Sequence, residues 1–387
     1  MRALVSGGGT GGHVYPLLVV VEALTGEPGD VQVLYVGSPS GMEESIVART
    51  GLAYRSVDCG PIRGTTPWAL WQSVRRLWRG YVQAKALLSE WPADVVLTTG
   101  GYVSVPTSVA AWRKRIPVLV YLPDREPGWA VWLLSWLVER IAISFEEVRT
   151  AFPAACRHKV WVSGYPVRDA LLKADRGAGY QTLGLDPALK TLLVLGGSRG
   201  ARSINQALAA SLPRLLAKYQ VIHASGQLDW PDVVKSRDGL PEQLKARYRV
   251  YPYLHEELFA AMAVADVGLA RAGAATTAEF PAAGLPSILV PYPYSGQHQE
   301  LNADFMAAHG AAVRLDDADL GTQLEPTVVR LLDDDAALER MGKAARSLAR
   351  PDAAHRLAGE LRRLAQGLPP ASDISDREGQ RSGETAR

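Results

Sequence analysis

The sequence predicts an α/β protein of two successive domains, each built on a parallel sheet. Short apolar segments alternate with helical patterns along most of the chain, which is typical of βα units. A strand, a glycine-rich loop and an apolar helix follow one another twice, with the loops at Gly7–Gly12 and Gly196–Gly200. The length of 387 residues suits two domains, at ~100–200 residues each.

The first domain is expected over residues 1–165. It begins with a buried strand at Arg2–Ser6, which leads through the first glycine loop to a helix over Pro16–Leu24. Further strands are expected at Val31–Val36, Val95–Thr98, Val118–Tyr121, Ile141–Ser144 and Val160–Ser163. Helices are expected at Glu43–Thr50, Pro67–Glu90, Val103–Arg113, Gly128–Val138 and Glu146–Phe152.

The second domain is expected over residues 166–366, where the pattern restarts after a stretch rich in Gly, Pro, Asp and Lys. Its strands are expected at Thr191–Leu195, Gln220–His223, Tyr248–Tyr251, Val267–Ala270 and Ser287–Val290. Its helices are expected at Ala201–Lys218, Glu256–Ala265, Ala274–Gly284 and His298–His309. Residues 367–387 lack apolar periodicity, so we expect a disordered tail there.

Composition narrows the classes of protein. Lys and Arg number 42 against 40 Asp and Glu, which gives no reason to expect a nucleic-acid partner. Cys59 and Cys156 are too few for a disulfide scaffold or a cysteine metal site and favour a reduced, cytosolic setting. The N-terminus does not have the pattern of a signal peptide. The most apolar stretch, Trp129–Val138, covers about half of the ~20 residues that a membrane span needs.

The first glycine loop matches G-x-G-x-x-G at Gly7, Gly9 and Gly12. A dinucleotide enzyme usually has an acidic residue at the end of the second strand, where this chain reads Tyr-Val-Gly-Ser, so the match argues weakly for a nicotinamide cofactor. Backbone N–H groups at a helix start suit anionic or sugar-bearing ligands instead. His13 follows at once; it is either a capping or partly buried histidine, or a general base or sugar contact.

The second loop and the segment after residue 270 favour a nucleotide. A nucleotide diphosphate could be neutralised by the helix N-termini behind the two glycine loops rather than by a metal ion. Small residues from Ala272 to Ala275 leave room for a ligand against the backbone, and Glu279, about one turn into the helix, could accept from both ribose hydroxyls. Gln299 and Asn302 share a helix face and could bind sugar hydroxyls.

Two carboxylate triplets, Asp317–Asp319 and Asp333–Asp335, have the D-x-D form with which many nucleotide-sugar enzymes hold a metal ion. Both lie late in the chain in charged segments that are typical of a solvated face. We therefore expect no metal site and no cofactor.

Over residues 1–365 these motifs resemble the MurG glycosyltransferases. The resemblance rests on Gly-Gly-Thr-Gly-Gly-His ending at His13, on Gly-Gly-Ser-Arg-Gly-Ala from Gly196 with Asn205, and on Arg271 through Glu279 to Gln299 and Asn302. It implies the GT-B fold, in which two Rossmann-like domains face a central cleft. It also implies inverting transfer of GlcNAc from UDP-N-acetylglucosamine (UDP-GlcNAc) to lipid I, undecaprenyl-pyrophosphoryl-MurNAc-pentapeptide, which gives lipid II for peptidoglycan.

The resemblance also assigns roles to residues. Thr10, Gly11 and Gly12 would line the donor sugar and diphosphate, with His13 beside them, and Ser198 would contact the diphosphate. Arg168 matches the arginine at the end of the family's first domain and would also bind UDP-GlcNAc. Leu254 would lie at the uracil, Glu279 on the ribose and Gln299 at the GlcNAc. The nucleotide would also contact the start of the helix, at Ala274, Ala275, Thr276, Thr277 and Ala278.

The acceptor side departs from the family pattern. Where the family has a His-Glu-Gln-Asn run, this chain reads Tyr121-Leu-Pro-Asp124, and Val131 stands at a nearby family asparagine. Asp124 is either the base that deprotonates the acceptor hydroxyl, or a sugar ligand, or a turn residue before Pro127. His13 and Asp124 are the two candidate catalytic residues. A related transferase with another lipid or small acceptor, or a UDP-sugar epimerase of similar fold, is the alternative.

Nine of the ten tryptophans precede residue 165. Within Pro67–Leu88, apolar residues recur at spacings of three and four, with Arg75, Arg76 and Arg79 beside them. This pattern is typical of a helix in a lipid headgroup layer; the alternative is that the tryptophans form the core of the domain. We expect a peripheral protein on an anionic membrane surface, at the cytoplasmic face of the cell membrane.

Overall fold

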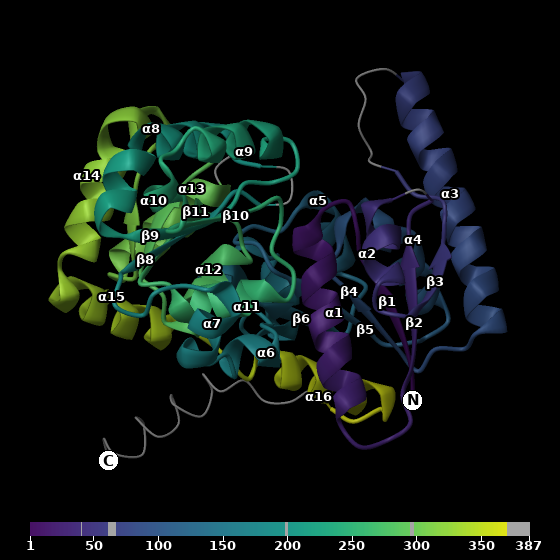
Figure 1. Cartoon of the computed structure of the whole chain (residues 1–387). Coiled ribbons are helices and arrows are strands. Elements are labelled where there is room, and N and C mark those ends of the chain that lie inside the picture. Colours follow the sequence, from purple (N-terminus) through teal and green to yellow (C-terminus); the bar gives the residue numbers. More distant parts are fainter. Residues whose placement is uncertain (40, 61–66, 198–199, 295–297, 370–387) are drawn as a thin grey trace, which may run out of the picture. The chain divides into compact units, whose positions relative to one another are not determined.

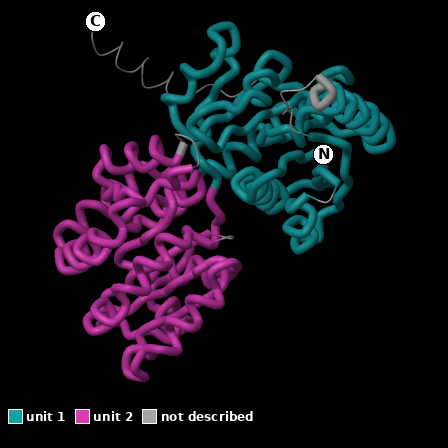
Figure 2. Tube along the Cα trace, turned by 90° about the horizontal axis from the view of Figure 1, so that it is seen from above, with its two compact units in different colours: residues 1–166, 352–387 teal, residues 167–351 magenta. Residues whose placement is uncertain are grey.

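The computed structural model describes residues 1–39, 41–60, 67–197, 200–294 and 298–369 (Figure 1). It divides into two compact units, which Figure 2 shows in different colours. Unit 1 holds Met1–Pro166 and the chain from Asp352 onward, and unit 2 holds Val167–Pro351. The expected second domain ran to residue 366, so the last helix was assigned to the wrong unit. Residues 370–387 of the expected tail lie outside the described residues.

Unit 1 is built on a seven-stranded parallel sheet in the order β3-β2-β1-β4-β5-β6-β7. Its strands are β1 (Arg2–Ser6), β2 (Gln32–Gly37), β3 (Ala53–Ser56), β4 (Val95–Thr98), β5 (Val118–Leu122), β6 (Arg140–Ile143) and β7 (Val160–Val162). Strand β3 was not predicted, because this edge strand is mostly exposed and has no apolar run. Strand order reverses between β1 and β4. Open α/β sheets bind ligands at the carboxyl ends of the strands beside such a reversal.

The helices of unit 1 largely follow the expected pattern. They are α1 (Gly11–Gly26), α2 (Met42–Ala48), α3 (Pro67–Glu90), α4 (Gly101–Arg113), α5 (Trp129–Leu134) and α16 (Ala353–Ala365), with 3₁₀ turns η1 (Glu146–Ala151) and η2 (Ala154–Lys159). Helix α1 starts five residues before Pro16, so His13 lies in its first turn. Helix α5 ends at Leu134, four residues before the expected end at Val138. At its end the Ser135 hydroxyl donates to the Trp132 carbonyl (2.6 Å). The expected helix at Glu146–Phe152 is a 3₁₀ turn over Glu146–Ala151. It ends before Phe152, because the residue that precedes a proline disfavours the α-helical region.

Helix α16 packs on α1 although more than 300 residues separate them along the chain (Figure 1). Its Glu360 is 2% exposed and pairs with the buried Arg140 guanidinium of β6 at 3.3 Å. Arg356 donates to the Val162 carbonyl (2.9 Å) and lies 4.9 Å from the Trp161 ring centre. These contacts bind the end of the described chain to unit 1, which no local sequence pattern indicates.

Unit 2 is built on a six-stranded parallel sheet in the order β10-β9-β8-β11-β12-β13. Its strands are β8 (Thr191–Leu195), β9 (Gln220–Ala224), β10 (Tyr248–Tyr251), β11 (Val267–Arg271), β12 (Ser287–Val290) and β13 (Ala312–Arg314). Its helices are α6 (Asp169–Leu172), α7 (Arg176–Leu183), α8 (Arg202–Lys218), α9 (Trp230–Asp238), α10 (Glu242–Lys245), α11 (Glu257–Val264), α12 (Thr276–Ala283), α13 (His298–Ala308), α14 (Leu320–Leu332) and α15 (Asp335–Leu348), with the 3₁₀ turn η3 (Asp317–Asp319). Strand order reverses between β8 and β11. The predicted fold class, two α/β domains with parallel sheets, is confirmed.

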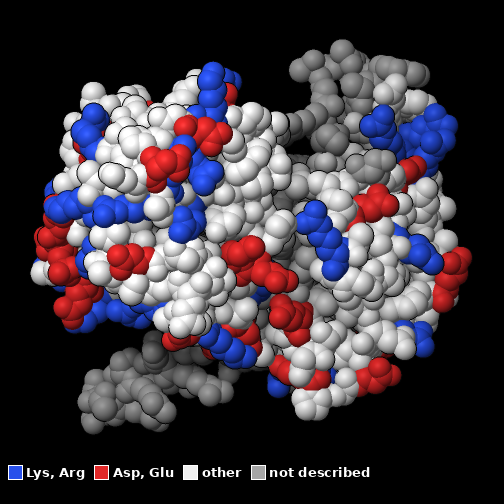
Figure 3. All heavy atoms as spheres, viewed as in Figure 1, with Lys and Arg blue, Asp and Glu red and all other residues white. Residues whose placement is uncertain are grey.

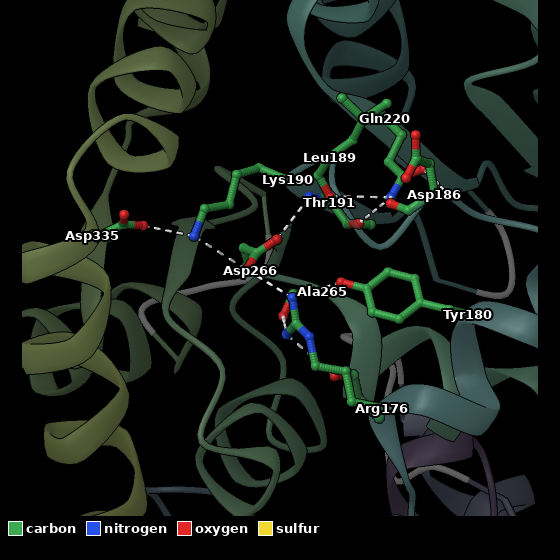
Figure 4. A network of polar contacts seen from close by, with 11 residues as sticks. Arg176, Tyr180, Asp186, Leu189, Lys190, Thr191, Gln220, Ala265, Asp266 and Asp335 are labelled. Atoms are coloured by element: carbon green, nitrogen blue, oxygen red, sulfur yellow. Dashed lines mark hydrogen bonds and ion pairs between the residues drawn. The ribbon is translucent and has the colours of Figure 1, made fainter.

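A polar network fixes the amino ends of the central strands of unit 2 (Figure 4). Asp266, just before β11, accepts from the Thr191 amide (2.8 Å) and from the Arg176 guanidinium of α7 (2.9 Å). Lys190 lies 3.7 Å from the same carboxylate and 2.6 Å from Asp335 on α15. The network joins two helices to the sheet at the edge opposite to the glycine loop.

Among the described residues, no helix combines the length and the apolar character that a bilayer crossing requires.

Candidate functional site

In unit 1 the first glycine loop lies at the carboxyl end of β1, at the reversal of strand order. The Tyr35 hydroxyl of β2 donates to the Gly7 carbonyl (2.8 Å). Gly9 has φ +87°, a left-handed backbone conformation that residues other than glycine rarely adopt. The loop then enters α1, whose first turn contains Gly11, Gly12 and His13 after Thr10.

His13 is held through its backbone. Its carbonyl accepts from the Thr99 hydroxyl at the end of β4 (2.9 Å), and its amide donates to the Thr10 carbonyl (3.1 Å). The imidazole is half-buried, and within the described part of the chain its buried Nδ1 has no hydrogen-bond partner. An unpaired ring nitrogen at the carboxyl edge of the sheet fits a proton-transfer or ligand-binding role better than a capping role.

Asp124 lies at the same edge, two residues after the end of β5. Strands β1 and β5 flank β4, so they are about 10 Å apart at ~4.8 Å per strand. The Asp124 side chain is half-buried, and no hydrogen bond to its carboxylate comes from the described residues. The structure therefore brings the glycine loop, His13 and Asp124 to one edge of unit 1.

The residues that replace the family's acceptor motif are part of the core. Tyr121 is fully buried, and its hydroxyl lies 2.8 Å from the Ser144 hydroxyl. Burial raises the pKa of Tyr121 well above 10, so it cannot act as a base at neutral pH. Val131 is 3% exposed and packs against Gly100, where a Cβ would clash with it. Of the four residues Tyr121–Asp124, the aspartate alone offers an accessible titratable group.

In unit 2 the second glycine loop follows β8 in the same way. Gly196 donates to the Ala224 carbonyl (2.7 Å), and Gly200 has φ +111°. Ser198, expected at the diphosphate, lies outside the described residues. The loop enters α8, a helix of 17 residues whose N-terminus carries partial positive charge toward this edge.

A buried polar chain lies beneath this loop. Asn205 of α8 donates to the Ser225 carbonyl (3.0 Å) and to Asp229 (2.9 Å), and its oxygen lies 2.9 Å from His223 Nε2. His223 Nδ1 lies 2.7 Å from the Tyr248 hydroxyl. Burial lowers the pKa of His223 to about 3, so this histidine stays neutral and supports the loop rather than titrating. Sequence reasoning missed His223, because a histidine inside a buried strand has no signal of its own.

Helix α12 follows β11, the neighbour of β8, and begins beside this loop. Ala274, Ala275, Thr276, Ala278 and Glu279 are half-buried at its start, which leaves the backbone accessible. Thr277 is buried, and its hydroxyl donates to the carbonyls of Gly273 (3.2 Å) and Ala274 (3.1 Å). Its backbone amide also donates to the Gly273 carbonyl (3.0 Å), so both the hydroxyl and the amide of Thr277 are engaged within this segment.

Glu279 is a titratable side chain at this edge, in the first turn of α12. Burial raises the pKa of Glu279 to about 7, and the positive charge of Arg168 opposes that rise. Arg168 precedes α6 and stacks on Phe259 of α11 at 4.6 Å from its ring centre. No residue in the described part donates a hydrogen bond to the Glu279 carboxylate, so it can accept from a ligand.

Helix α13 adds two amides to the same edge. The Gln299 oxygen accepts from the Tyr292 amide (3.0 Å) after β12. Asn302 is buried and donates to the Ala272 carbonyl (2.9 Å), so it ties α13 to the loop after β11. Asn302 is therefore a structural amide, whereas Gln299 is half-buried. Leu254, after β10, is 2% exposed and packs into unit 2.

The carboxylate triplets are engaged in ion pairs and a helix cap. Arg271 lies 2.5 Å from Asp317 and donates to the Ser203 hydroxyl (2.7 Å). Asp333 accepts from Lys218 (2.6 Å), and Asp334 caps α15. In the described ranges, no three His, Cys, Asp or Glu side chains are grouped as a metal site requires.

Glu43 is a second residue that sequence reasoning missed. Its side chain is 1% exposed and lies against the first glycine loop, at the end of β2, where a dinucleotide enzyme would have an acidic residue. The carboxylate comes from α2 instead of the strand, so the strand's own residues do not indicate it.

Two parallel-sheet units, each with a glycine loop at a reversal of strand order, define a two-domain α/β protein of the nucleotide-sugar-binding class. The family models agree. Residues 3–143 match the glycosyltransferase family 28 N-terminal domain, and residues 191–357 match the glycosyltransferase family 28 C-terminal domain. The chain belongs to glycosyltransferase family 28.

Relatives and solved structures extend this result. The chain is 36% identical to UDP-N-acetylglucosamine–N-acetylmuramyl-(pentapeptide) pyrophosphoryl-undecaprenol N-acetylglucosamine transferase of Halothermothrix orenii, over 95% of this chain and 100% of that protein. It is 38% identical to the protein of the same name from Roseiflexus sp., over 94% and 95%. The MurG crystal structure from Acinetobacter baumannii superposes with a TM-score of 0.73 at 24% identity and covers 94% and 99% of the two chains. A UDP-GlcNAc 2-epimerase from Neisseria meningitidis reaches 0.65 at 15% identity, over 93% and 99%, which shows the shared fold alone.

Proposed function

We propose that this chain transfers N-acetylglucosamine from UDP-GlcNAc to the lipid-linked acceptor lipid I, with inversion at C1, and so makes lipid II. The observation that carries the proposal is the match over more than 90% of the chain to relatives named for this reaction. The similarity to epimerases is confined to the fold, so an epimerase remains the weaker candidate.

The donor is assigned to unit 2. Glu279 accepts from the ribose hydroxyls, Leu254 lies at the uracil, and Gln299 lies at the GlcNAc. The small residues at the start of α12 let the nucleotide approach the backbone. Negative charge that develops on the departing UDP is stabilised by backbone N–H groups and by the N-termini of α8 and α12, without a metal ion.

The acceptor is assigned to unit 1. As its hydroxyl attacks C1 of the donor sugar, it loses a proton to His13 or Asp124, which are titratable side chains at this edge and have no hydrogen-bond partner at His13 Nδ1 or the Asp124 carboxylate within the described residues. The glycine loop with Thr10, Gly11 and Gly12 lets the sugars approach the first turn of α1. Tyr121 is buried, so Asp124 is the accessible acidic residue in the segment that replaces the family's His-Glu-Gln-Asn run.

The outer surface of unit 1 supports binding to an anionic membrane. Trp71 and Trp78 on α3 are 50% and 65% exposed, so they are not core residues. A groove of about 470 Å³ between α3 and α4 is lined by apolar side chains, among them Trp78 and Trp112, with Arg113 at its side. Lys and Arg side chains gather over α3 (Figure 3). Indole rings beside cations favour a lipid headgroup layer.

Three further exposed tryptophans lie on α5 and directly after it. Trp129 and Trp132 on α5, and Trp136 after it, are 58%, 42% and 49% exposed. Helix α5 packs on α4, which packs on α3. The proposed location is thus peripheral, on the cytoplasmic face of the membrane that holds the lipid-linked acceptor.

The proposal is tested by radiolabel transfer. The protein is incubated with labelled UDP-GlcNAc and a lipid I analogue in anionic vesicles, and label in the lipid fraction is counted. Transfer to the lipid I analogue supports the proposal. Transfer only to other lipid acceptors identifies a different member of the family, and release of free sugar alone contradicts the proposal.

A further inference from the structure

Glu43 is a buried carboxylate in a site built for it. It is the second residue of α2, and its side chain reaches the carboxyl ends of β1 and β2. One carboxylate oxygen accepts from the Ser38 amide (2.8 Å) and from the Ser38 hydroxyl (2.5 Å). The other oxygen accepts from the Gly9 amide in the glycine loop (3.4 Å).

Three glycines make room for this carboxylate. A Cβ on Gly8 would lie 2.6 Å from the Glu43 carboxyl carbon, and a Cβ on Gly37 would lie 2.8 Å from its Cγ. A Cβ on Gly41 would also clash with the carboxylate. A side chain at position 8 would therefore clash with the Glu43 carboxylate, so the glycine loop and Glu43 fit each other.

The charge is compensated by hydrogen-bond donors instead of a cation. Within the described residues, no Lys, Arg or His forms an ion pair with Glu43. An ionised carboxylate in that position needs each of its N–H and O–H donors, because burial without them is costly. Substitution of the carboxylate must therefore alter the loop that supplies Gly9.

Tyr35 and Tyr54 lie near the Glu43 carboxylate, and they donate hydrogen bonds to the loops that contact Glu43. Burial and then the Glu43 charge raise the pKa of Tyr35 and Tyr54 above 10. Both hydroxyls stay protonated and donate, Tyr35 to the Gly7 carbonyl (2.8 Å) and Tyr54 to the Ser38 carbonyl (2.9 Å). Burial and the same charge raise the pKa of the Cys59 thiol to about 12, so this cysteine remains neutral.

The held loop leads directly to the candidate catalytic residue. Three residues separate Gly9 from His13, whose carbonyl accepts from the Thr99 hydroxyl. We infer that Glu43 is a positioning residue: through Gly9 and Ser38 it holds the glycine loop of unit 1 in the conformation that presents His13 and the first turn of α1 to the acceptor. The inference rests on the proposed function for the identity of the acceptor.

The test compares Glu43→Gln with Glu44→Gln. Glu44 is the next residue of α2, is exposed, and loses the same charge in the same helix turn. The amide of Glu43→Gln keeps the side-chain shape but places an NH₂ group against one of the donors. Because a misplacement of about 1 Å can cost ~10²-fold in rate, we expect kcat to fall about 10- to 100-fold. The KM for UDP-GlcNAc and the melting temperature should stay close to those of Glu44→Gln.

A kcat for Glu43→Gln within twofold of Glu44→Gln would overturn the inference. If Glu43→Gln does not fold, Ser38→Ala serves instead, because it removes one of the three bonds and keeps the carboxylate. Ser38→Ala should lower kcat severalfold at an unchanged donor KM, and a wild-type kcat would again overturn the inference.

Hydrogen exchange separates this inference from the proposed function. Peptides that cover Gly7–His13 should exchange faster in Glu43→Gln than in Glu44→Gln, whichever acceptor the enzyme uses. If wild-type protein transfers no GlcNAc to lipid I but the loop is loosened, the proposed function fails and the positioning role stands. If the exchange rates of the loop are equal, the positioning role fails.

Discussion

Ionisation of Glu279 should make donor binding depend on pH in the neutral range. Burial raises the pKa of Glu279 to about 7, and its carboxylate has no donor among the described residues of the free protein. The ionised form binds hydroxyl donors better than the protonated form, so ribose binding selects the carboxylate. The affinity for UDP-GlcNAc should therefore fall as pH falls below about 7.

The magnitude follows from the ionised fraction. With a pKa of about 7, roughly 90% of Glu279 is ionised at pH 8 and roughly 10% at pH 6. If the ionised form alone binds the ribose well, the dissociation constant rises about tenfold between pH 8 and pH 6. Removing the carboxylate in Glu279→Ala should cost ~1.5–3 kcal/mol of binding free energy at pH 8.

The assay is titration calorimetry with UDP-GlcNAc at pH 6, 7 and 8. Glu279→Gln should bind more weakly than wild type at pH 8 and should lose the pH dependence. Glu339→Gln, an exposed charge on α15, is the matched control and should behave as wild type. A wild-type dissociation constant that is unchanged from pH 6 to 8, or wild-type affinity in Glu279→Ala, would refute the assignment of Glu279 to the ribose.

Four other outcomes are expected. The true base should lose about 10²–10⁴-fold in turnover at saturating donor when His13→Ala and Asp124→Asn are compared, and near-normal turnover in both would place the proton elsewhere. Donor binding should persist in EDTA, and a strict requirement for a divalent ion would contradict the metal-free arrangement. The pKa of Glu279 is about 7 in the folded protein and 4.5 in the unfolded chain, so the free energy of unfolding should fall as the pH rises from about 4.5 to 7. The free energy of unfolding of Glu279→Gln, measured in urea at pH 8, should therefore exceed that of wild type by about 1–3 kcal/mol. Trp71→Ser with Trp78→Ser should reduce co-sedimentation with anionic vesicles at unchanged UDP-GlcNAc affinity, and a folded double variant that still sediments would place the membrane surface elsewhere.

The sequence predicted the elements with strong local patterns. Buried strands such as Val95–Thr98 were indicated by apolar runs. The first glycine loop marked the edge of the unit 1 sheet near His13, and the second marked the edge of the unit 2 sheet near Glu279. The packing of α16 on unit 1 was not predictable, because it depends on the distant pair Arg140–Glu360. The amphipathic pattern of α3 left two alternatives, core or surface, and the exposed tryptophans decide between them.

Within the site, the buried residues that support the glycine loops were not predicted from the sequence. Glu43 accepts a hydrogen bond from Gly9 of the first glycine loop, and His223 lies within hydrogen-bond distance of Asn205 in the helix that follows the second loop. Both contacts join segments that are distant in the sequence. No local pattern encodes such pairs. Tyr121 was singled out because it aligns with a functional position of the family, but its side chain is fully buried, which the alignment did not indicate.

The central claim is most directly tested by the chemical identity of the product. Purified protein is given UDP-GlcNAc and a lipid I analogue, and the lipid product is examined by mass spectrometry and by NMR of the new anomeric centre. The account predicts one added N-acetylhexosamine in β linkage to MurNAc and one UDP released per disaccharide formed. Release of UDP with free N-acetylmannosamine and an unchanged lipid would contradict it, because that outcome identifies an epimerase.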